Sequence, residues 1–235
     1  DELIASVSHE LRTPLTAVVG LSAELSEGLE TFDAEVVTDL LGMIHRQSQD
    51  VAHIVEDLLV AARSSIGVLT IISEPVDLAL EVLRCVSDFG FAEHPGLTVE
   101  ASSVVAQADP ARLRQILRNL LTNAFRYGGD QIAVRTRRDG DHAVVSVSDD
   151  GPGVSEEMRE AIFEPFTRAH AQTTMPGAVG VGLSVSRELA HLMGGELSYH
   201  NSGSSVFELT LQLAHGIEHQ VETAVRSGGS PLLSD

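Results

Sequence analysis

Apolar positions in the first part of the chain recur with the period of helices that pack against each other. Between about Leu3 and Glu27 the spacing alternates between three and four residues, which is typical of a coiled-coil seam. A second run, from about Ala34 to Ser64, repeats the pattern, and the segment from Gly28 to Asp33 supplies a turn. The spacing therefore predicts a hairpin of two long antiparallel helices. The first seam consists of Ile4, Val7, Leu11, Pro14, Val18, Leu21 and Leu25, and the second of Val37, Leu40, Ile44, Val51, Ile54, Leu58 and Ala61, widened by Leu41, Val55 and Leu59.

This hairpin carries more apolar surface than two helices can bury against each other. Pairing two such hairpins gives a four-helix bundle, and identical chains pair most simply about a two-fold axis. We therefore expect residues 1–65 to form a homodimeric four-helix bundle.

The pattern changes after Ser64-Ser65-Ile66-Gly67, which we interpret as a domain boundary. Short apolar runs then alternate with helical patterns, as in a layered α+β domain. Asp109 and Pro110 supply the cap and first residue of a helix that continues to about Tyr127, and Asp139-Gly140 is a hairpin turn. The expected strands lie at 68–72, at 97–101 and 104–107 as a pair, and at 131–137, 142–148, 196–199 and 205–213, and the other expected helices lie at 77–90, 156–162 and 182–193.

The sequence thus predicts an α-helical hairpin at 1–65 and a two-layer α+β domain at 66–213. From 214 to 235 the chain is polar and rich in Gly and Ser, which predicts a disordered tail.

Composition narrows the classes of function. Apolar residues make up 43% of the 235 positions, enough for a real core. The net charge is −19 and every basic residue is Arg, which disfavours nucleic acid and anionic membrane surfaces as partners. Nucleotide binding is not disfavoured, because it can depend on backbone amides, one Arg and a metal ion.

The sequence also bears on the compartment. Cys85 is the single cysteine and lies in an apolar helical pattern, which favours a place in the core and a reducing cytoplasm. The sequence contains no apolar run long enough for a membrane span and no signal peptide. Because it begins abruptly inside a helical pattern, we expect it to be the cytoplasmic portion of a longer, membrane-anchored chain, with the part that reaches the membrane outside this sequence.

The first helix carries candidate chemistry in the string SHELRTPL at residues 8–15. The heptad register puts His9 at the outermost f position, where it would face solvent. A lone His on a helix surface is usually just a solvated side chain. Here Glu10 could orient a ring nitrogen and accept its proton, and Thr13 lies one turn further on, near the same face. The group as a whole indicates proton transfer at His9.

Three later segments could bind a nucleotide. A helix presents Asn119, Asn123, Arg126 and Tyr127 along one side, and two carboxamides, a cation and an aromatic ring suit a magnesium triphosphate and a purine. The segment 149–153, DDGPG, puts a carboxylate at a strand end before glycines that let backbone approach a ring, although a plain turn would explain it equally well.

The third segment, GAVGVGL at 177–183, runs into a helix N-terminus. Such a terminus offers free N–H groups and a positive dipole end to phosphate. Phe163-Glu164-Pro165-Phe166 would lie at the base of a mobile lid.

The string at 8–15 resembles the phospho-acceptor box of sensor histidine kinases. The order and spacing of the three later segments resemble the ATP-binding domain of the same family, which belongs to the GHKL or Bergerat-fold superfamily, so that the resemblance spans about residues 3–213. It implies that His9 takes the γ-phosphoryl group of ATP and passes it to an aspartate of a response regulator. The implied nucleotide-binding residues are Asn119, Asn123, Arg126, Tyr127, Asp149, Gly151, Gly153, Gly177, Gly180, Gly182 and Leu183, with Mg²⁺ at Asn123 and Asn119.

The resemblance gives these residues distinct roles. Arg126 and the glycines hold phosphate, Tyr127 borders the adenine, and Asp149 reads its amino group. Asn119 stands where related ATPases carry a glutamate that activates water. Because an amide cannot act as a base, attack by water is disfavoured and transfer to His9 is left as the outlet.

The sequence departs from the family pattern at two places. Arg126 stands where Lys is usual, and its planar fork still binds phosphate but is bulkier. Ala178-Val179 replaces a commoner Gly-Thr and removes a hydroxyl that could contact phosphate. We expect these changes to affect lid closure and rate, and not the class of protein.

Two other interpretations remain open. The protein could be bifunctional, with dephosphorylation of its regulator as the main output and with Glu10 and Thr13 positioning the attacking water. It could also be a dimerisation module that binds nucleotide without turnover. Against this count four residues that are intact: His9, Glu10, Asn123 and Asp149.

Overall fold

The computed structural model describes residues 2–28, 31–88, 90, 94–165, 167, 180–201 and 203–214, and the side chains of residues 2–6, 9 and 10 lie outside this description. Two compact units divide the chain. One comprises the described parts of 1–70, 152–189 and 199–202, and the other comprises those of 71–151, 190–198 and 203–235. The predicted tail at 214–235 lies, apart from its first residue, outside the described residues. None of the helices that the structure describes has the length and apolar character needed to cross a membrane.

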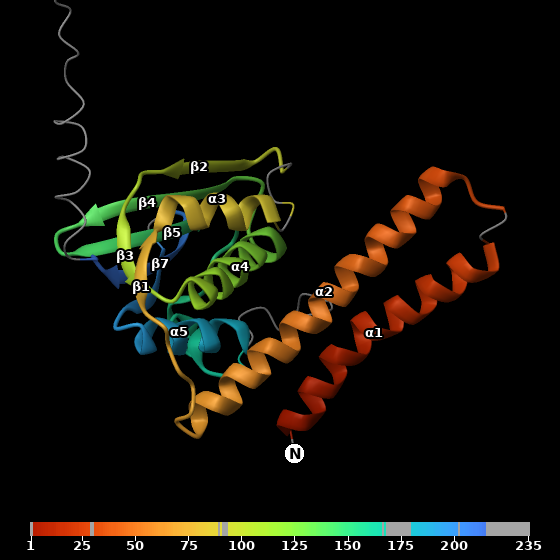
Figure 1. The fold of residues 1–235 in the computed structure, drawn as a ribbon, viewed down its shortest axis with the longest axis horizontal. Coiled ribbons are helices and arrows are strands. Elements are labelled where there is room, and N and C mark those ends of the chain that lie inside the picture. The colour runs from red at the N-terminus through yellow and green to blue at the C-terminus, as the bar shows by residue number, and fades with distance from the viewer. Residues whose placement is uncertain are drawn as a thin grey trace, which may run out of the picture. The chain divides into compact units, whose positions relative to one another are not determined.

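Helix α1 (Glu2–Gly28) and helix α2 (Ala34–Ser65) form the predicted hairpin. The two helices run side by side in opposite directions (Figure 1). Every predicted seam residue whose side chain is described is buried or half-buried, from Val7 to Leu25 on α1 and from Val37 to Ala61 on α2. The alternation of three and four residues in the sequence is therefore confirmed as the contact between the helices.

The hairpin also keeps large apolar side chains in solvent. Leu15 and Val19 on α1 are 46% and 68% exposed, and Leu41, Val55 and Leu59 on α2 are 52%, 42% and 48% exposed. These five residues lie outside the seam between α1 and α2, and we call them the exposed stripe. The widened part of the predicted second seam is thus not covered by α1.

A five-stranded mixed sheet follows, in the order β2-β4-β5-β7-β6. Its strands are β2 (Leu97–Ala101), β4 (Ile132–Asp139), β5 (His142–Asp149), β6 (Glu196–Asn201) and β7 (Ser205–Gln212). Strand β2 pairs parallel with β4, whereas β4–β5 and β5–β7 are antiparallel. The register places Asp149 opposite Ile132 on one side and opposite Ser205 on the other.

Helices α3 (Leu78–Asp88) and α4 (Pro110–Tyr127) pack on each other and on the sheet, and both lie over the same face of it (Figure 1). The apolar side of α4 is almost fully buried, as are Val145 and Val147 of β5. Cys85 of α3 lies in this core, as predicted, and burial raises the pKa of its thiol to about 12. The α+β two-layer prediction is therefore confirmed.

Helix α4 begins where local chemistry requires it. Pro110 occupies the first turn, where its missing N–H costs nothing. The Asp109 carboxylate accepts hydrogen bonds from the backbone N–H groups of Ala111 at 3.0 Å and Arg112 at 3.2 Å. The same carboxylate accepts a bond from the N–H of Ile72 at 2.9 Å, so that the cap also holds the chain segment that precedes strand β1 (Glu74–Asp77).

Three local predictions were wrong. Residues 68–72 are not a strand, and strand β1 is instead Glu74–Asp77. The antiparallel partner β3 (Val105–Ala108) pairs only with these four residues, so that residues 68–72 have no partner strand in this ladder. The runs at 97–101 and 104–107 are both strands, but they belong to different sheets, because β2 pairs with β4 and β3 with β1. The helix expected at 156–162 is two 3₁₀ turns, η2 (Glu156–Met158) and η3 (Ala161–Phe163). Helix α5 (Gly182–Leu192) follows the predicted bounds closely.

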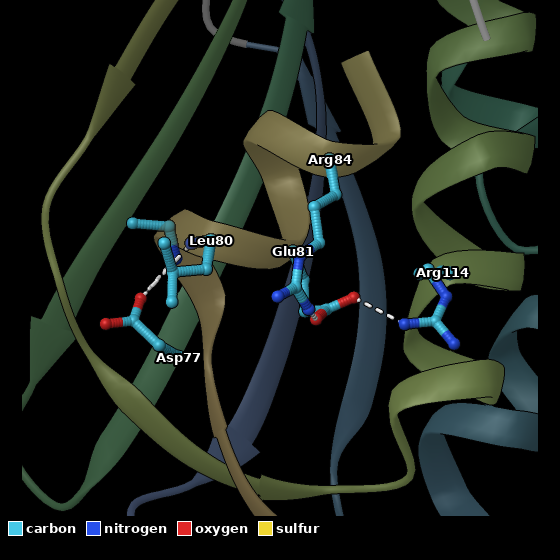
Figure 2. A network of polar contacts seen from close by, with 6 residues as sticks. Asp77, Leu80, Glu81, Arg84 and Arg114 are labelled. Atoms are coloured by element: carbon cyan, nitrogen blue, oxygen red, sulfur yellow. Dashed lines mark hydrogen bonds and ion pairs between the residues drawn. The ribbon is translucent and has the colours of Figure 1, made fainter. Parts of the chain in front are cut away.

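A buried carboxylate joins α3 to α4. The Glu81 side chain is only 4% exposed, and its two oxygens accept from Arg84 at 2.7 Å and from Arg114 at 2.9 Å. Figure 2 shows Glu81 between these two arginines, with Asp77 at the start of α3, where its carboxylate accepts from the N–H of Ala79 at 2.8 Å. The ion pair with Arg114 therefore adds a charged contact to the apolar packing of α3 on α4.

We predict that Glu81→Gln lowers the free energy of unfolding by about 1–2 kcal/mol, because charge-assisted hydrogen bonds to two arginines are weakened at a buried position. The arginines are 62% and 40% exposed, which holds the loss below that of a fully buried pair. Glu100→Gln is the matched control, because Glu100 forms a similar pair with Arg135 at 2.7 Å but in solvent. Denaturant unfolding of both variants checks this, and an equal loss in the two would contradict it.

Candidate functional site

The row of polar residues predicted on one side of α4 is present. Asn119, Asn123, Arg126 and Tyr127 are all half-buried, whereas the leucines on the opposite side of the helix are buried. The apolar side fixes the rotation of α4 and thereby sets the row at the edge of the buried layer. Its amide groups, guanidinium and aromatic ring thus lie in one strip at the end of the helix.

The C-terminal end of α4 presses against the end of β5. Gly128 caps the helix, and its N–H donates to the carbonyl of Ala124 at 2.9 Å. A Cβ at Gly128 would lie 2.8 Å from the Asp149 Cβ, and one at Gly151 would lie 2.7 Å from the Gly128 Cα. Only glycines allow this approach. The structure therefore brings the end of the Asn119–Tyr127 row beside Asp149 and Gly151.

Asp149 is a buried carboxylate, with 7% of its surface exposed. One carboxylate oxygen accepts the N–H of Gly151 at 3.0 Å, and the hydroxyl of Ser205 also bonds to it. Burial raises the pKa of Asp149 above its ordinary value, the Gly151 N–H and the Ser205 hydroxyl lower it, and the nearby charge of Asp150 raises it. Burial of this carboxylate costs free energy of folding, and the two donors hold it in a fixed orientation.

Sequence reasoning missed several residues of this site. Ser205 is 4% exposed and lies across from Asp149 in the β5–β7 ladder, and no local pattern reveals a contact between strands so far apart. Gly129 was missed as well, although a Gly-Gly pair directly after a helix was a usable signal; a Cβ there would lie 2.2 Å from the Asp150 carboxylate. Asp150 itself accepts the N–H of Gln131 at 2.8 Å, which fixes the loop end.

The remaining described glycines of the predicted nucleotide site, Gly153, Gly180 and Gly182, belong to the first compact unit, which includes residues 152–189. Gly153 has a φ of +66° and Gly180 one of +71°, backbone conformations that favour glycine. Gly182 is the first residue of α5, and it and Leu183 are half-buried. Gly177 and the Ala178-Val179 departure lie outside the described residues. The predicted junction of a glycine-rich segment with a helix N-terminus is therefore present from Gly180 onward.

The segment before the predicted lid is anchored to α5. The Arg187 guanidinium lies 4.6 Å from the centre of the Phe163 ring, and it also forms an ion pair with Glu160 at 2.9 Å. Phe163 is buried. Phe166, the second aromatic residue of the expected lid base, lies outside the described residues.

The phospho-acceptor candidates lie on α1. Residues 9 and 10 are helical in backbone, but the side chains of His9 and Glu10 lie outside the described part, so that the predicted orientation of His9 stays a prediction. Ser8 and Arg12 are exposed, and Thr13 is half-buried beside the buried Pro14. Among the described residues, no group of three or more His, Cys, Asp or Glu could hold a metal ion.

Two family models match the chain. Residues 1–66 match the His Kinase A (phospho-acceptor) domain, and residues 108–215 match the Histidine kinase-, DNA gyrase B-, and HSP90-like ATPase domain. Together the two matches cover both parts of the chain in which the sequence placed its candidate chemistry.

Named relatives agree with this assignment. Signal transduction histidine-protein kinase AfsQ2 of Streptomyces coelicolor is 33% identical over 220 residues, which cover 88% of this chain and 41% of the relative. Probable sensor histidine kinase TcrY of Mycobacterium tuberculosis is 32% identical over 219 residues, 90% of this chain and 46% of the relative. The chain therefore spans less than half the length of these two proteins.

Solved structures share the fold. Acinetobacter baumannii histidine kinase AdeS superposes with a TM-score of 0.61 at 24% identity, over 88% of this chain and 98% of the other. Full-length ShkA in complex with AMPPNP also gives a TM-score of 0.61, at 25% identity, over 92% of this chain and 47% of the other.

We predict opposite effects on the free energy of unfolding for two substitutions, one at Asp149 and one at its hydrogen-bond partner Ser205. Because its pKa is raised in the folded state, the folded protein binds this proton more tightly than the unfolded chain. The stability due to this group is complete below the unfolded pKa and is lost as pH rises through the folded pKa. Asp149→Asn cannot ionise, so that it should unfold at higher denaturant than the parent at neutral pH, with a difference that vanishes in acid.

Ser205→Ala should act in the other direction, because it removes a donor to the charged form and thereby lowers stability at neutral pH. Denaturant unfolding from about pH 3 to pH 8 checks both variants. A loss for Asp149→Asn that is the same at every pH would show that the carboxylate carries no net burial cost.

Proposed function

This chain belongs to the sensor histidine kinases of two-component signalling, and we propose that it transfers the γ-phosphoryl group of ATP to His9 and then to an aspartate of a response regulator. The observation that carries the proposal is the buried, hydrogen-bonded Asp149 directly beside the end of the Asn119–Tyr127 row. A buried carboxylate costs stability, which is a reason to look for a ligand that uses it.

Asp149 suits the recognition of adenine. Its two oxygens offer more acceptor positions than the Gly151 N–H and the Ser205 hydroxyl occupy. An exocyclic amino group is the donor that such an acceptor requires, and Gly151 lets a flat ring approach the backbone. In this proposal Asp149 reads the amino group of adenine, with Gly151 and Gly153 along the ring and Tyr127 at its border.

The phosphates would lie along the α4 row and the glycine-rich segment. Arg126 supplies a fork of donors, and Gly180, Gly182 and Leu183 lead into the N-terminus of α5, where N–H groups attract anions. Gly177 would extend this segment. The amide oxygens of Asn123 and Asn119 fit Mg²⁺, which favours oxygen ligands and is often held mainly by phosphate and few protein groups. When bound, the ion would neutralise charge on the phosphates. The relative ShkA was solved with AMPPNP, which supports an adenine nucleotide here.

The transfer requires little covalent chemistry from the protein. A ring nitrogen of His9 attacks the γ-phosphorus, the bond to the β–γ bridging oxygen breaks, and ADP leaves. The proton of the attacking imidazole passes to Glu10. Asn119 cannot serve as a base for water, so that hydrolysis is disfavoured and the phosphoryl group goes to His9. Thr13 has no task in this step, and in the phosphatase interpretation it would aim water at a phosphorylated regulator.

The exposed stripe of the hairpin supports a homodimer. Five large apolar side chains in solvent on two helices exceed what a monomeric hairpin would keep exposed. A second copy offers the same stripe about a two-fold axis and would complete a four-helix bundle.

We predict that His9→Gln abolishes acid-labile labelling by γ-labelled ATP but leaves the ATP dissociation constant within about twofold, because His9 is not part of the nucleotide site. His45→Gln is the matched control, since His45 is exposed on the same hairpin, and it should retain both properties. Filter binding of the label and calorimetry with ATP measure the two effects. Label that persists on the His9 variant would show that another residue is the acceptor.

For the dimer, we predict that Leu41→Glu together with Leu59→Glu gives a monomer at tens of micromolar, where the parent is dimeric, because four charges would enter the bundle core. Sedimentation equilibrium measures the mass. Arg12→Glu, at an exposed polar position of α1, is the control and should leave the dimer intact. A parent that sediments as a monomer would contradict the bundle.

A further inference from the structure

The loop that follows Asp149 ends against strand β6. Gly153 has a φ of +66°, and a Cβ there would lie 2.5 Å from the Asn201 amide nitrogen and 2.9 Å from the Tyr199 hydroxyl oxygen. Any side chain at Gly153 would therefore collide with β6. The close approach shows that this part of the loop is shaped by its contact with β6 as well as by its own sequence.

A hydrogen bond ties the loop down at the next residue. The backbone N–H of Val154 donates to the Tyr199 hydroxyl at 2.9 Å. Tyr199 is 9% exposed and Val154 is half-buried. The contact joins positions that are 45 residues apart in the chain, so that local structure does not produce it.

An outside tie limits the freedom that the loop keeps of its own. Residues 150–155 form no helix or strand. Pro152 restricts itself and Gly151, whereas Gly153 adds conformations that the free loop can adopt. The loop is held at β5 by the bond from Gly151 to Asp149 at 3.0 Å and at β6 by the bond from Val154 to Tyr199. Gly151 is thus part of the first anchor, and Gly153 directly precedes the second.

We propose that Tyr199 is a positioning residue for nucleotide binding: its hydroxyl holds the Val154 end of the loop, and thereby keeps Gly151 and Gly153 in the conformation that receives the adenine ring. This inference rests on the proposed function. Without the hydroxyl, the loop must be ordered when the nucleotide binds, and affinity falls by that ordering cost. The step of phosphoryl transfer is not touched, since Tyr199 contacts no reacting atom.

A simpler reading is that Tyr199 is a core aromatic whose hydroxyl merely finds a partner, as buried tyrosines do. The two readings differ in what Tyr199→Phe changes. This substitution keeps the ring and removes only the hydroxyl. A merely structural role would lower stability and leave nucleotide affinity unchanged, whereas a positioning role changes affinity for ATP with the maximal rate preserved.

The test uses the full chain, the variant Tyr199→Phe and the matched control Thr136→Val. Thr136 is 4% exposed, and its hydroxyl donates to the carbonyl of Ser102 at 2.6 Å, so that this control also removes one buried hydroxyl bond to backbone, but at the β2–β4 edge. Calorimetry measures the dissociation constant of magnesium ATP, a labelling assay measures the autophosphorylation rate at saturating ATP, and hydrogen exchange measures protection of the Val154 amide.

We expect Tyr199→Phe to lose protection of the Val154 amide and to weaken ATP binding about 3- to 10-fold, the factor for one hydrogen bond. Its rate at saturating ATP should stay within about twofold of the parent, and Thr136→Val should change neither quantity by more than that. Unchanged ATP affinity in Tyr199→Phe, or an equal loss in Thr136→Val, would overturn the inference and leave the proposed function standing. A parent that binds no ATP would overturn both.

Discussion

The burial of one carboxylate constrains the α+β part of this protein. Asp149 ends β5 beneath the C-terminus of α4 and is 7% exposed. A charge in that position is stable only if donors reach it, and the Gly151 N–H and the Ser205 hydroxyl do so. Both donors depend on features outside their own segment. Ser205 reaches Asp149 because of the register of β7 against β5. Gly151 can lie close to the end of α4 because Gly128 has no side chain there.

The other elements can be understood as supports of that arrangement. Asp109 caps the start of α4, and Glu81 joins α4 to α3 through Arg114. The apolar side of α4 is almost fully buried, which fixes the rotation of the helix. With these constraints in place, the row from Asn119 to Tyr127 ends beside Asp149. Rigid support of this kind is what a binding site of fixed geometry requires.

The parts of the fold that could be predicted from sequence depend on local or periodic signals. The seam of the hairpin follows from spacings of three and four, and the start of α4 follows from Asp109 and Pro110, so that both were found within a residue or two. The strand at 68–72 was wrong because an apolar run becomes a strand only where a partner exists, and β3 reaches only from Val105 to Ala108. For the same reason the sequence could not reveal that β2 and β3 belong to different sheets, since this depends on their partners β4 and β1.

The site shows the same division. Asn123, Arg126 and Asp149 could be proposed as site residues because their spacing and neighbours are visible in the sequence. Ser205 and Tyr199 could not be found in this way. Ser205 reaches Asp149 only through the pairing of β7 with β5, and Tyr199 bonds to a residue 45 positions earlier in the chain. No local sequence pattern encodes either contact. The roles of His9 and Glu10 depend on an orientation outside the described side chains, and they remain predictions.

The proposed role of Asp149, that its buried carboxylate reads the amino group of adenine, can be measured directly. GTP carries a carbonyl where ATP carries the amino group, so that calorimetry of the full chain with magnesium ATP and magnesium GTP, for the parent and for Asp149→Asn, tests this role. We expect the parent to bind ATP at least about tenfold more tightly than GTP. We expect Asp149→Asn to lose about 1.5–3 kcal/mol of ATP affinity, the contribution of a hydrogen bond to a charged group. Equal affinity of the parent for the two nucleotides, with no loss in the variant, would contradict it.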